Sequence, residues 1–366
     1  MPAPKNTFKQ ALAQGDRQIG CWLSSGEAVI AEIMGSCGFD WLVIDGEHGP
    51  NDIRSIRDQL MALEACASHP VVRLPIGETW MVKQVLDVGA QNILIPMVET
   101  ADQARDMVRA CQYPPHGTRG VGATAARATM FGKTSEYIQT ADQEICLLLQ
   151  VENRAGIENL DAILAVEGVD GVFIGPADLA ASMGHAGAPA HPEVKAAVMD
   201  GIRRITAAGK PAGFLALDQG YLREAEAAGA QFIAVGLDLT LMRDAALATR
   251  VLPCLDALAH AHARGVIHRD LKPANLVTAP GGRLLLVDFG VSAHEGSLVA
   301  PSAGSIPFMA PEQVRGDIHD QGPWTDLYAL ALTVWAWVAG RSPFETAEQQ
   351  LQRPPPLQLL PPSLRP

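Results

Sequence analysis

The chain has 366 residues, of which 48% are hydrophobic, and a formal charge of −12 at pH 7. A chain of this length and composition can bury a large core, so we expect one large domain and a smaller one. The acidic balance argues against nucleic acid and anionic membranes as main partners, because both attract basic surfaces.

Cysteine usage and the N-terminal residues indicate the cytoplasm. The six cysteines form no CxxC pair and no zinc-type cluster with histidine, which is typical of a protein from a reducing compartment. No apolar signal core follows Met-Pro-Ala-Pro-Lys at the start of the chain. The longest apolar stretch, Leu327–Gly340, is too short to cross a bilayer and predicts a buried helix.

Eight short apolar runs alternate with amphipathic stretches over roughly the first 250 residues, which is the usual size of a (β/α)8 TIM barrel. Each run is rich in valine, isoleucine, leucine or phenylalanine, as expected for parallel strands that are covered on both faces. The runs are Ile19–Ser25, Trp41–Asp45, Val71–Pro75, Asn92–Met97, Ile145–Glu152, Gly171–Pro176, Ala212–Ala216 and Gln231–Gly236. The helical stretches include Glu27–Cys37, Ile53–Cys66, Ala101–Cys111, Pro192–Ala208 and Gln219–Ala228. We therefore predict an α/β TIM barrel, with an open doubly wound sheet as the alternative.

Polar residues follow four of the predicted strands. Asp45 and His48 follow the second, Arg73 ends the third, Glu152 ends the fifth, and Asp178 lies just past the sixth. The carboxyl ends of barrel strands meet at one rim, where TIM barrels carry their chemistry. One acidic residue at a strand end is more often a helix cap than a ligand. The prediction of a site therefore rests on the whole set.

This set of residue types suits the enolisation of a 2-oxo acid. Glu152 and Asp178 can supply oxygen ligands to a divalent cation such as Mg²⁺ or Mn²⁺. Arg73 offers a planar fork to a substrate carboxylate. His48 can move a proton near neutral pH, and Asp45 can orient its imidazole.

Two other chemistries are weighed against this one. A Schiff-base mechanism needs a lysine at a strand end, and none lies there. The lysines of the predicted barrel are Lys5, Lys9, Lys83, Lys133, Lys195 and Lys210. A dinucleotide fingerprint of the GxGxxA type occurs at residues 120–125, but a Pro-Pro turn precedes it where the fingerprint needs a strand.

At these residues the chain resembles the HpcH/HpaI aldolase family of metal-dependent pyruvate aldolases. The resemblance covers residues 5 to 248. Its motifs are Asp40-Trp41-Leu42-Val43-Ile44-Asp45-Gly46-Glu47-His48, Lys83-Gln84-Val85-Leu86-Asp87-Val88-Gly89, Ile95-Pro96-Met97-Val98-Glu99-Thr100, Tyr113-Pro114-Pro115, Arg119-Gly120-Val121-Gly122, Gln150-Val151-Glu152 and Phe173-Ile174-Gly175-Pro176-Ala177-Asp178-Leu179.

The resemblance implies a role for each matched position. The expected metal ligands for Mg²⁺, Mn²⁺ or Co²⁺ are Glu152 and Asp178, and the expected acid–base pair is His48 with Asp45. The group that binds the pyruvyl unit is Arg73, Gln150, the backbone near Ala177, and Asp178, while Asp87 matches a supporting acidic position. The implied partners are pyruvate and an aldehyde, and the implied assembly is a homo-oligomer, typically a hexamer.

From Leu252 onward the chain resembles the C-lobe of bacterial Ser/Thr protein kinases. The motifs are His268–Asn275, Asp288-Phe289-Gly290, Ala310-Pro311-Glu312 and Thr325-Asp326-Leu327-Tyr328. In that family Asp270 accepts the proton of the substrate hydroxyl, Lys272 steadies the phosphate, and Asn275 and Asp288 hold Mg²⁺. Asp326 would brace the catalytic loop.

The nucleotide-holding half of a kinase has no counterpart in this sequence. No Gly-rich loop and no VAIK-type lysine precede the catalytic loop at the right distance. Phosphoryl transfer depends on positioning and charge neutralisation, so we expect this segment to be an inactive mainly helical fragment, with kinase activity or ATP binding as the alternative. The predicted domains are a barrel at 1–250, a kinase-like segment at 251–350 and a proline-rich tail at 351–366 that we expect to be disordered.

Overall fold

The computed structural model describes residues 1–122, 124–279, 284–289, 293–294, 306–344 and 346–352. The chain divides into two compact units, residues 1–241 and 242–366. Helix α12 (Asp238–His262) runs without interruption through this boundary and through residue 250, where the sequence placed the end of the barrel domain. Of the predicted tail, residues 353–366 lie outside the described residues, and Leu351 and Gln352 belong to a helix.

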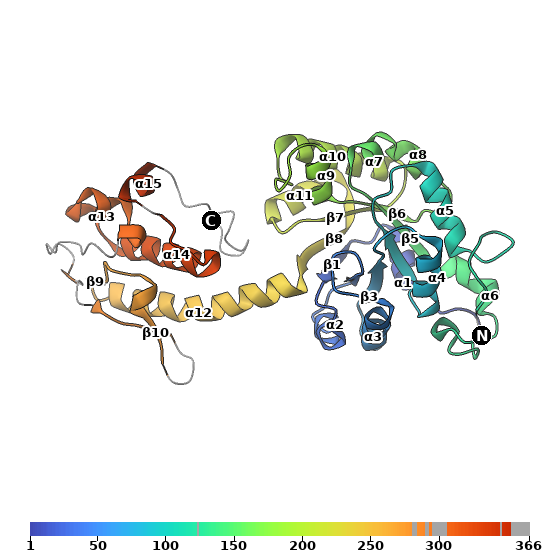
Figure 1. Ribbon diagram of the computed structural model, residues 1–366, viewed down its shortest axis with the longest axis horizontal. Helices are drawn as coiled ribbons and strands as arrows, with labels where there is room; N and C mark the ends of the chain where they lie inside the picture. The colour runs from blue at the N-terminus through green and yellow to red at the C-terminus, as the bar shows by residue number, and fades with distance from the viewer. Residues whose placement is uncertain (123, 280–283, 290–292, 295–305, 345, 353–366) are drawn as a thin grey trace. The chain divides into compact units, whose positions relative to one another are not determined.

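The first unit is a closed barrel of eight parallel strands (Figure 1). The strands are β1 (Gln18–Leu23), β2 (Trp41–Asp45), β3 (His69–Arg73), β4 (Asn92–Ile95), β5 (Cys146–Val151), β6 (Gly171–Ile174), β7 (Ala212–Leu215) and β8 (Ala230–Leu237). Because β1 pairs with β8, the sheet has no edge, and the predicted TIM barrel is confirmed over the doubly wound alternative.

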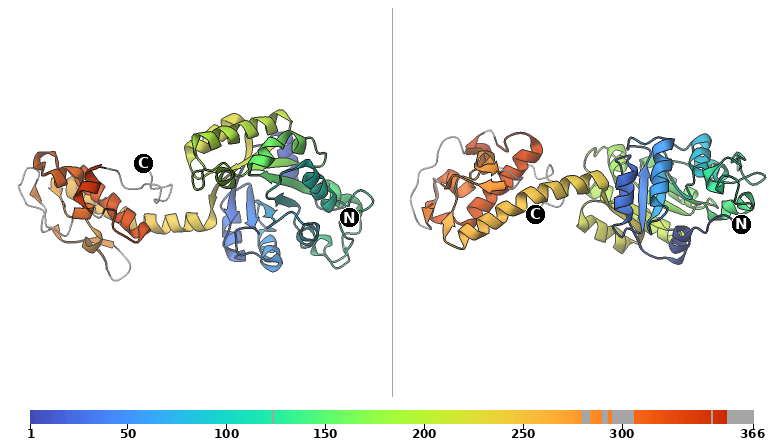
Figure 2. Two further views of the ribbon diagram at one scale, coloured as in Figure 1. Left: turned by 45° about the horizontal axis from the view of Figure 1, so that its top comes forward. Right: turned by 90° about the horizontal axis from the view of Figure 1, so that it is seen from below.

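Helices surround the barrel and connect its strands (Figures 1 and 2). They are α1 (Thr7–Gln14), α2 (Ala28–Gly35), α3 (Ile53–Leu63), α4 (Thr79–Asp87), α5 (Ala101–Cys111), α6 (Tyr137–Thr140), α7 (Arg154–Glu158), α8 (Leu160–Leu164), α9 (Pro176–Ser182), α10 (Pro192–Ala207) and α11 (Gln219–Ala228). Several begin with a side chain that caps the free N–H groups of the first turn, as Asp52 does for α3 and Thr100 for α5.

The strands carry two separate apolar layers. The inward layer contains large rings from four strands, and Trp22, Trp41, Phe173 and Phe232 contact one another at centroid distances of 5.4–6.0 Å. The outward layer packs against the surrounding helices. This double burial explains why the strands read as continuous apolar runs and not as alternating ones.

Helix α1 closes the end of the barrel where the strands begin. Phe8 is fully buried and contacts Trp41 at a centroid distance of 6.1 Å. The side chain of Asn6 donates to Asn92 at the start of β4, and Lys9 donates to the carbonyl of Ile145 just before β5. The predicted site residues follow the strands at the opposite end of the barrel.

The second unit is mainly helical, as predicted. Its described elements are β9 (Val266–Ile267), η3 (Pro273–Asn275), β10 (Leu276–Thr278), β11 (Leu284–Leu286), β12 (Ala293–His294), η5 (Ile306–Phe308), α13 (Pro311–Arg315), η6 (Ile318–Asp320), α14 (Pro323–Ala339) and α15 (Ala347–Gln352). Most of the apolar stretch at Leu327–Gly340 lies in α14, whose buried side chains include Leu330, Leu332 and Trp335. Among the described residues, no helix is both long enough and apolar enough to cross a membrane.

Candidate functional site

The barrel register places Asp45 beside Arg73 at the carboxyl ends of β2 and β3. The Arg73 guanidinium donates from Nε to one Asp45 oxygen at 2.9 Å and from Nη2 to the other at 2.7 Å. Its Nη1 lies 2.8 Å from Glu47 Oε2, and its Cζ lies 5.5 Å from the Trp22 ring centroid. Both Arg73 and Asp45 are buried, so two carboxylates and one ring hold the arginine in place.

His48 lies at the same rim but does not pair with Asp45 through its ring. Asp45 Oδ1 accepts from the backbone N–H groups of Glu47 and His48, at 3.0 and 3.2 Å, and both Asp45 oxygens bind Arg73. The His48 side chain is exposed. The geometry therefore assigns Asp45 first to Arg73, whereas the sequence suggested that it orients the imidazole.

Glu152 is buried at the end of β5 and is held by two donors. The N–H of Met97 donates to its Oε1 at 2.9 Å, and the amide of Gln150 donates to its Oε2. Met97 takes a left-handed backbone conformation with φ 56°, which is uncommon outside glycine and clusters at functional sites. A Cβ added at Gly175 would lie 2.4 Å from Glu152 Oε2, so only glycine leaves room for this carboxylate.

The carboxylates at this rim affect one another's charge. Burial raises the pKa of Glu152, the hydrogen bonds from Gln150 and Met97 oppose this, and the charges of Glu47 and Asp178 raise it further. Burial also raises the pKa of Glu47, Arg73 and His48 oppose this, and Asp45 and Asp178 add to it. Asp45, His48, Arg73 and Asp178 therefore act on Glu47, and Glu47 and Asp178 act on Glu152.

Glu47 was not chosen from the sequence. Its position in the sequence indicates a site residue, since it lies between Asp45 and His48 in one motif at a strand end. Only the fold shows that its carboxylate lies 2.8 Å from Arg73 Nη1.

The donor set fits a hard divalent cation. Of the four carboxylates Asp45, Glu47, Glu152 and Asp178, the first two contact Arg73, and together these five groups have a formal charge of −3. Two buried oxygens, Glu47 Oε2 and Gln150 Oε1, accept no hydrogen bond; the contact of Glu47 with Arg73 is close but not aligned as one. Excess negative charge and buried oxygens without a hydrogen bond are what Mg²⁺ or Mn²⁺ would satisfy.

Asp178 and Ala177 lie in the first turn of α9, which begins directly after β6 at Pro176. Both are exposed at the rim, unlike the buried Gln150 on β5. The predicted metal ligands and pyruvyl-binding positions of this chain are thus carried by neighbouring strands and by the start of one helix.

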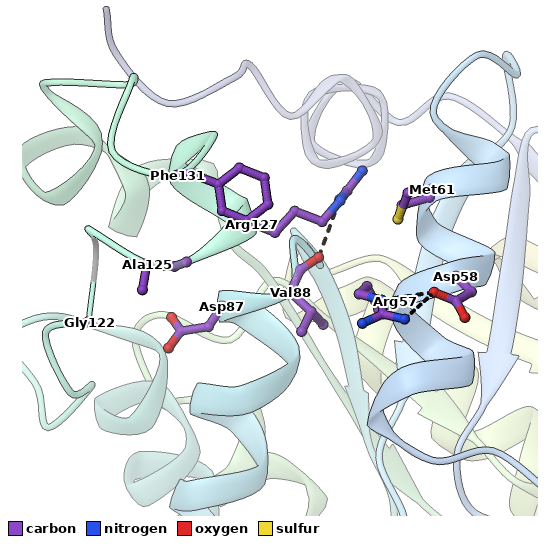
Figure 3. Close-up of a pocket in the computed structure, with 10 residues that line it drawn as sticks. Arg57, Asp58, Met61, Asp87, Val88, Gly122, Ala125, Arg127 and Phe131 are labelled. Carbon is purple, nitrogen blue, oxygen red and sulfur yellow. Dashed lines mark hydrogen bonds and ion pairs between the residues drawn. The ribbon is translucent and has the colours of Figure 1, made fainter.

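Asp87 is not brought to this rim. It ends α4, and a barrel helix runs back toward the end where the strands begin, here over about 13 Å. Asp87 accepts from Arg119 at 3.2 Å and borders a cavity of about 640 Å³ between α3, α4 and residues 122–131 (Figure 3). Asp87 therefore stays a predicted supporting residue, and the side chain that it contacts in this structure is Arg119.

The lysines do not favour an imine mechanism either. Lys9 and Lys210 donate to carbonyls just before β5 and β6, at the far end of the barrel. Lys5 pairs with Glu144 and Lys195 with Glu224. The stretch before Gly120 is irregular and contains no strand, so the dinucleotide reading lacks its context; Ala123 lies outside the described residues.

In the second unit, Asp326 binds the backbone of the loop that resembles a kinase catalytic loop. Its carboxylate accepts from the backbone N–H groups of His268 and Arg269 at 2.8 Å each, and contacts His262 Nε2 at 2.7 Å. Within the loop, Lys272 Nζ lies 2.7 Å from Asp270 Oδ2.

The other predicted kinase positions flank this loop. Asn275 donates to the carbonyl of Asp270 at 2.7 Å. Asp288 has φ 64° and follows Val287, whose carbonyl contacts His268 Nε2 at 3.1 Å. Gly290 of the predicted motif lies outside the described residues.

Comparison with known proteins supports both resemblances. The model of the family described as HpcH/HpaI aldolase/citrate lyase matches residues 18–245, and the protein kinase domain model matches residues 235–355. A hydroxypyruvate/pyruvate aldolase of Roseobacter denitrificans is 57% identical over 242 residues, which cover 66% of this chain and 94% of that protein. A 2-keto-3-deoxy-L-rhamnonate aldolase of Salmonella gallinarum is 53% identical over 240 residues, covering 66% and 90%.

A solved structure gives the same result for the fold. A HpcH/HpaI aldolase/citrate lyase family protein from Burkholderia cenocepacia superposes with a TM-score of 0.64 and 40% identity, over 66% of this chain and 96% of that one.

Proposed function

The chain belongs to the HpcH/HpaI aldolase/citrate lyase family, and from this premise we propose that it is a class II, metal-dependent aldolase that cleaves or forms 4-hydroxy-2-oxo acids through a pyruvate enolate. The observation that carries the proposal is the rim at the strand ends, where Arg73 is fixed by two carboxylates beside the buried Glu152.

Arg73 would bind the carboxylate of the 2-oxo acid. Asp45 occupies the edge formed by Nε and Nη2, and Glu47 Oε2 lies 2.8 Å from Nη1, so a substrate carboxylate would bind at the Nη1–Nη2 edge in competition with Glu47. Because the arginine is buried and preset, it loses little rotamer freedom when substrate binds. The amide of Gln150 and the backbone near Ala177 would bind the remaining pyruvyl oxygens.

Glu152 and Asp178 would hold the divalent cation, which when bound polarises the ketone and spreads the charge of the enolate, worth several kcal/mol. Glu152 is oriented for this by Met97 and Gln150. Mg²⁺, Mn²⁺ and Co²⁺ all suit an oxygen-rich set that keeps water.

His48 would take the proton from the 4-hydroxyl when the carbon–carbon bond breaks, and return it in the direction of synthesis. The ring is exposed at the rim and near the charge of Glu47. General acid–base help of this kind contributes about 10²–10⁴-fold.

The test is pyruvate release from a 4-hydroxy-2-oxo acid by the full chain, before and after EDTA. Chelation should abolish turnover, and Mg²⁺, Mn²⁺ or Co²⁺ should restore it. Glu152→Gln keeps the acceptor for the Met97 amide but removes the ligand charge, so it should fold and fail to respond to metal. Equal rates with and without EDTA would exclude the metal role.

The relatives suggest which substrates to offer. Proteins named hydroxypyruvate/pyruvate aldolase and 2-keto-3-deoxy-L-rhamnonate aldolase stand at similar identity to this chain. We propose pyruvate as the enolate donor, so the assay should present pyruvate and hydroxypyruvate with a series of aldehydes.

We also propose the cellular compartment and the oligomeric state of the enzyme. A reducing cytoplasm is supported by six cysteines that are all free. A homo-oligomer, with six copies by family resemblance, is supported by apolar side chains left uncovered on α2, where Val29 is 66% and Ile33 52% exposed. Sedimentation velocity on the full chain gives the number of copies.

Kinase activity or ATP binding by the second unit is the other candidate function. It is favoured by the contacts among Asp270, Lys272 and Asn275, which keep the catalytic loop in order. Against it stands the sequence before His268, in which the positions of a Gly-rich loop and its lysine are taken by the barrel and α12.

A further inference from the structure

Three side chains of metal-ligating type meet at the start of α10, outside the rim described above. His185 lies in the loop after α9, His191 is the N-cap of α10, and Glu193 lies in the first turn of that helix. One ligand atom from each lies within 4.8 Å of the ligand atoms of the other two. We call these three residues the histidine cluster.

The contacts within the histidine cluster are close. His185 Nε2 lies 3.0 Å from Glu193 Oε2. The rings of His185 and His191 stack with their centroids 3.6 Å apart and their planes 16° from parallel. The backbone N–H of Glu193 donates to His191 Nδ1 at 3.4 Å, which is a long hydrogen bond.

Backbone hydrogen bonds hold the loop that carries the two histidines. The N–H of His185 donates to the carbonyl of Ala180 in α9 at 2.7 Å. The N–H of Ala188 then donates to the carbonyl of His185, and the N–H of His191 to the carbonyl of Ala188, each at 2.9 Å. The cluster is therefore built on a defined turn and does not depend on long side chains that happen to meet.

We propose that the histidine cluster binds a divalent transition-metal ion of the zinc class, as a second metal site of this protein. Two imidazole nitrogens and one carboxylate oxygen are a ligand set that zinc uses, with water in the fourth position. Mg²⁺ and Ca²⁺ prefer oxygen ligands, so the cluster differs in metal preference from the carboxylate pair Glu152 and Asp178.

The site requires only side-chain rotation to close on an ion. Two nitrogens bound to one tetrahedral zinc lie about 3.4 Å apart, since each Zn–N bond is about 2.0–2.1 Å. The ligand atoms lie within 4.8 Å of one another, and the two rings must tilt out of their stacked arrangement so that one nitrogen of each turns to the ion. The side chains of His185 and Glu193 are 24% and 67% exposed, which leaves a path for the ion and its water.

The position of the histidine cluster gives the ion a structural consequence. Helix α9 begins with Asp178 in its first turn and ends three residues before His185. An ion shared by His185, His191 and Glu193 would tie the loop after α9 to the start of α10. It would leave the donors of the catalytic rim untouched.

The experiment is zinc binding to the full chain, stripped of metal and dialysed against Zn²⁺ with Mg²⁺ in large excess. The wild-type protein should bind one more zinc per chain than His185→Phe, a variant that keeps a flat ring against His191 but lacks the nitrogen. His116→Ala removes an exposed histidine elsewhere on the barrel unit and should bind as much zinc as the wild type. Glu152→Gln should keep the cluster's zinc, which separates this proposal from the aldolase proposal.

Glu193→Gln provides a second variant, and it should weaken the same zinc at least tenfold. Thermal melts by circular dichroism check that each variant is folded. The proposal is overturned if folded His185→Phe and Glu193→Gln both bind zinc with the number and affinity of the wild type. It is also overturned if Glu152→Gln alone removes all zinc that survives excess Mg²⁺.

Discussion

At the scale of single residues, the site depends on how charges are held in place. Arg73 is set by Asp45 and Glu47 and lies over Trp22, so it is oriented before substrate arrives. Glu152 is set by the backbone amide of Met97, which takes a left-handed conformation. Arg73 and Glu152, which we assign to substrate and metal, thus each have oriented partners.

The first residue-scale prediction concerns the shape of the arginine. Arg73→Lys keeps the charge but loses the planar fork, so the KM for the 2-oxo acid should rise about 10- to 150-fold, equivalent to about 1.5–3 kcal/mol. Steady-state kinetics on the folded variant measure this. The matched control is Arg57→Lys, on an exposed arginine paired with its neighbour Asp58, where KM should stay within twofold. A KM within twofold in Arg73→Lys would contradict the assignment.

The second residue-scale prediction concerns how the stability of the barrel depends on pH through Glu144. Burial alone would raise the pKa of Glu144, but hydrogen bonds from Lys5 Nζ at 2.6 Å and the Asn6 backbone at 2.8 Å lower it. A carboxyl with a lower pKa in the folded state stabilises the fold above the unfolded value, about 4.3, and loses this effect as pH falls through the folded value.

Glu144→Gln should therefore lower the free energy of unfolding by about 1 kcal/mol at pH 7, since Lys5 is largely exposed, and the deficit should shrink toward pH 3. Urea unfolding of the barrel at both pH values measures it. Glu136→Gln removes an exposed carboxylate near the N-terminal amine and should change neither value. If Glu144→Gln lowers the free energy of unfolding equally at both pH values, the charge of the Glu144 carboxylate does not stabilise the barrel.

At the scale of elements, the barrel is organised by which face of each strand is covered. The inward rings of β1, β2, β6 and β8 pack against one another, and α1 covers the end of this layer with Phe8. The outward side chains pack against the helices. Since both faces of the strands are covered by apolar side chains, packing helps to set the strand register, and the polar residues follow the strands at the same end of the barrel.

The element-scale prediction is that α1 is part of the barrel core. Phe8→Ala should lower the free energy of unfolding of the barrel unit by about 3–5 kcal/mol, because it leaves a cavity beneath Trp41. Calorimetry of the full chain shows the shift in the barrel transition. Phe131→Ala makes the same chemical change at a side chain that is 68% exposed and should shift this transition little. Equal shifts in the two variants would refute the role of α1.

At the scale of the whole molecule, two compact units share one chain, and they differ in completeness. The barrel has all eight strands and its polar rim. The second unit keeps the contacts of a kinase catalytic loop, including the support from Asp326. The arrangement of the catalytic loop is not sufficient for phosphoryl transfer, because the phosphates of ATP need a second lobe to hold them.

The whole-molecule prediction follows from this difference. In the full chain, the double variant Asp270→Asn with Asp288→Asn should cleave the 4-hydroxy-2-oxo acid at the wild-type rate within twofold. Wild-type protein with ATP and Mg²⁺ should show no rise in melting temperature beyond Mg²⁺ alone. A nucleotide-dependent rise that disappears in the double variant would instead establish ATP binding by the second unit.

The sequence by itself determined the barrel and most of the proposed site. The pattern of apolar residues, the length of each run and the residues that end it predicted eight buried strands. The polar residues at the strand ends are Asp45, His48, Arg73, Glu152 and Asp178. The barrel could be predicted because a strand buried on both faces must be apolar along its whole length. A charge at the end of such a strand is conspicuous, which is why these residues are the predicted site.

Only the tertiary structure decided how those charges are paired. It assigned Asp45 to Arg73, placed Glu47 beside Arg73 as well, and placed Asp87 at the far end of a helix. It also brought His185 beside His191 and Glu193 across a turn with no sequence signal of its own. The physical reason is that hydrogen bonds and charges act over a few ångströms, and distances that short are set by packing in three dimensions and not by spacing along the chain.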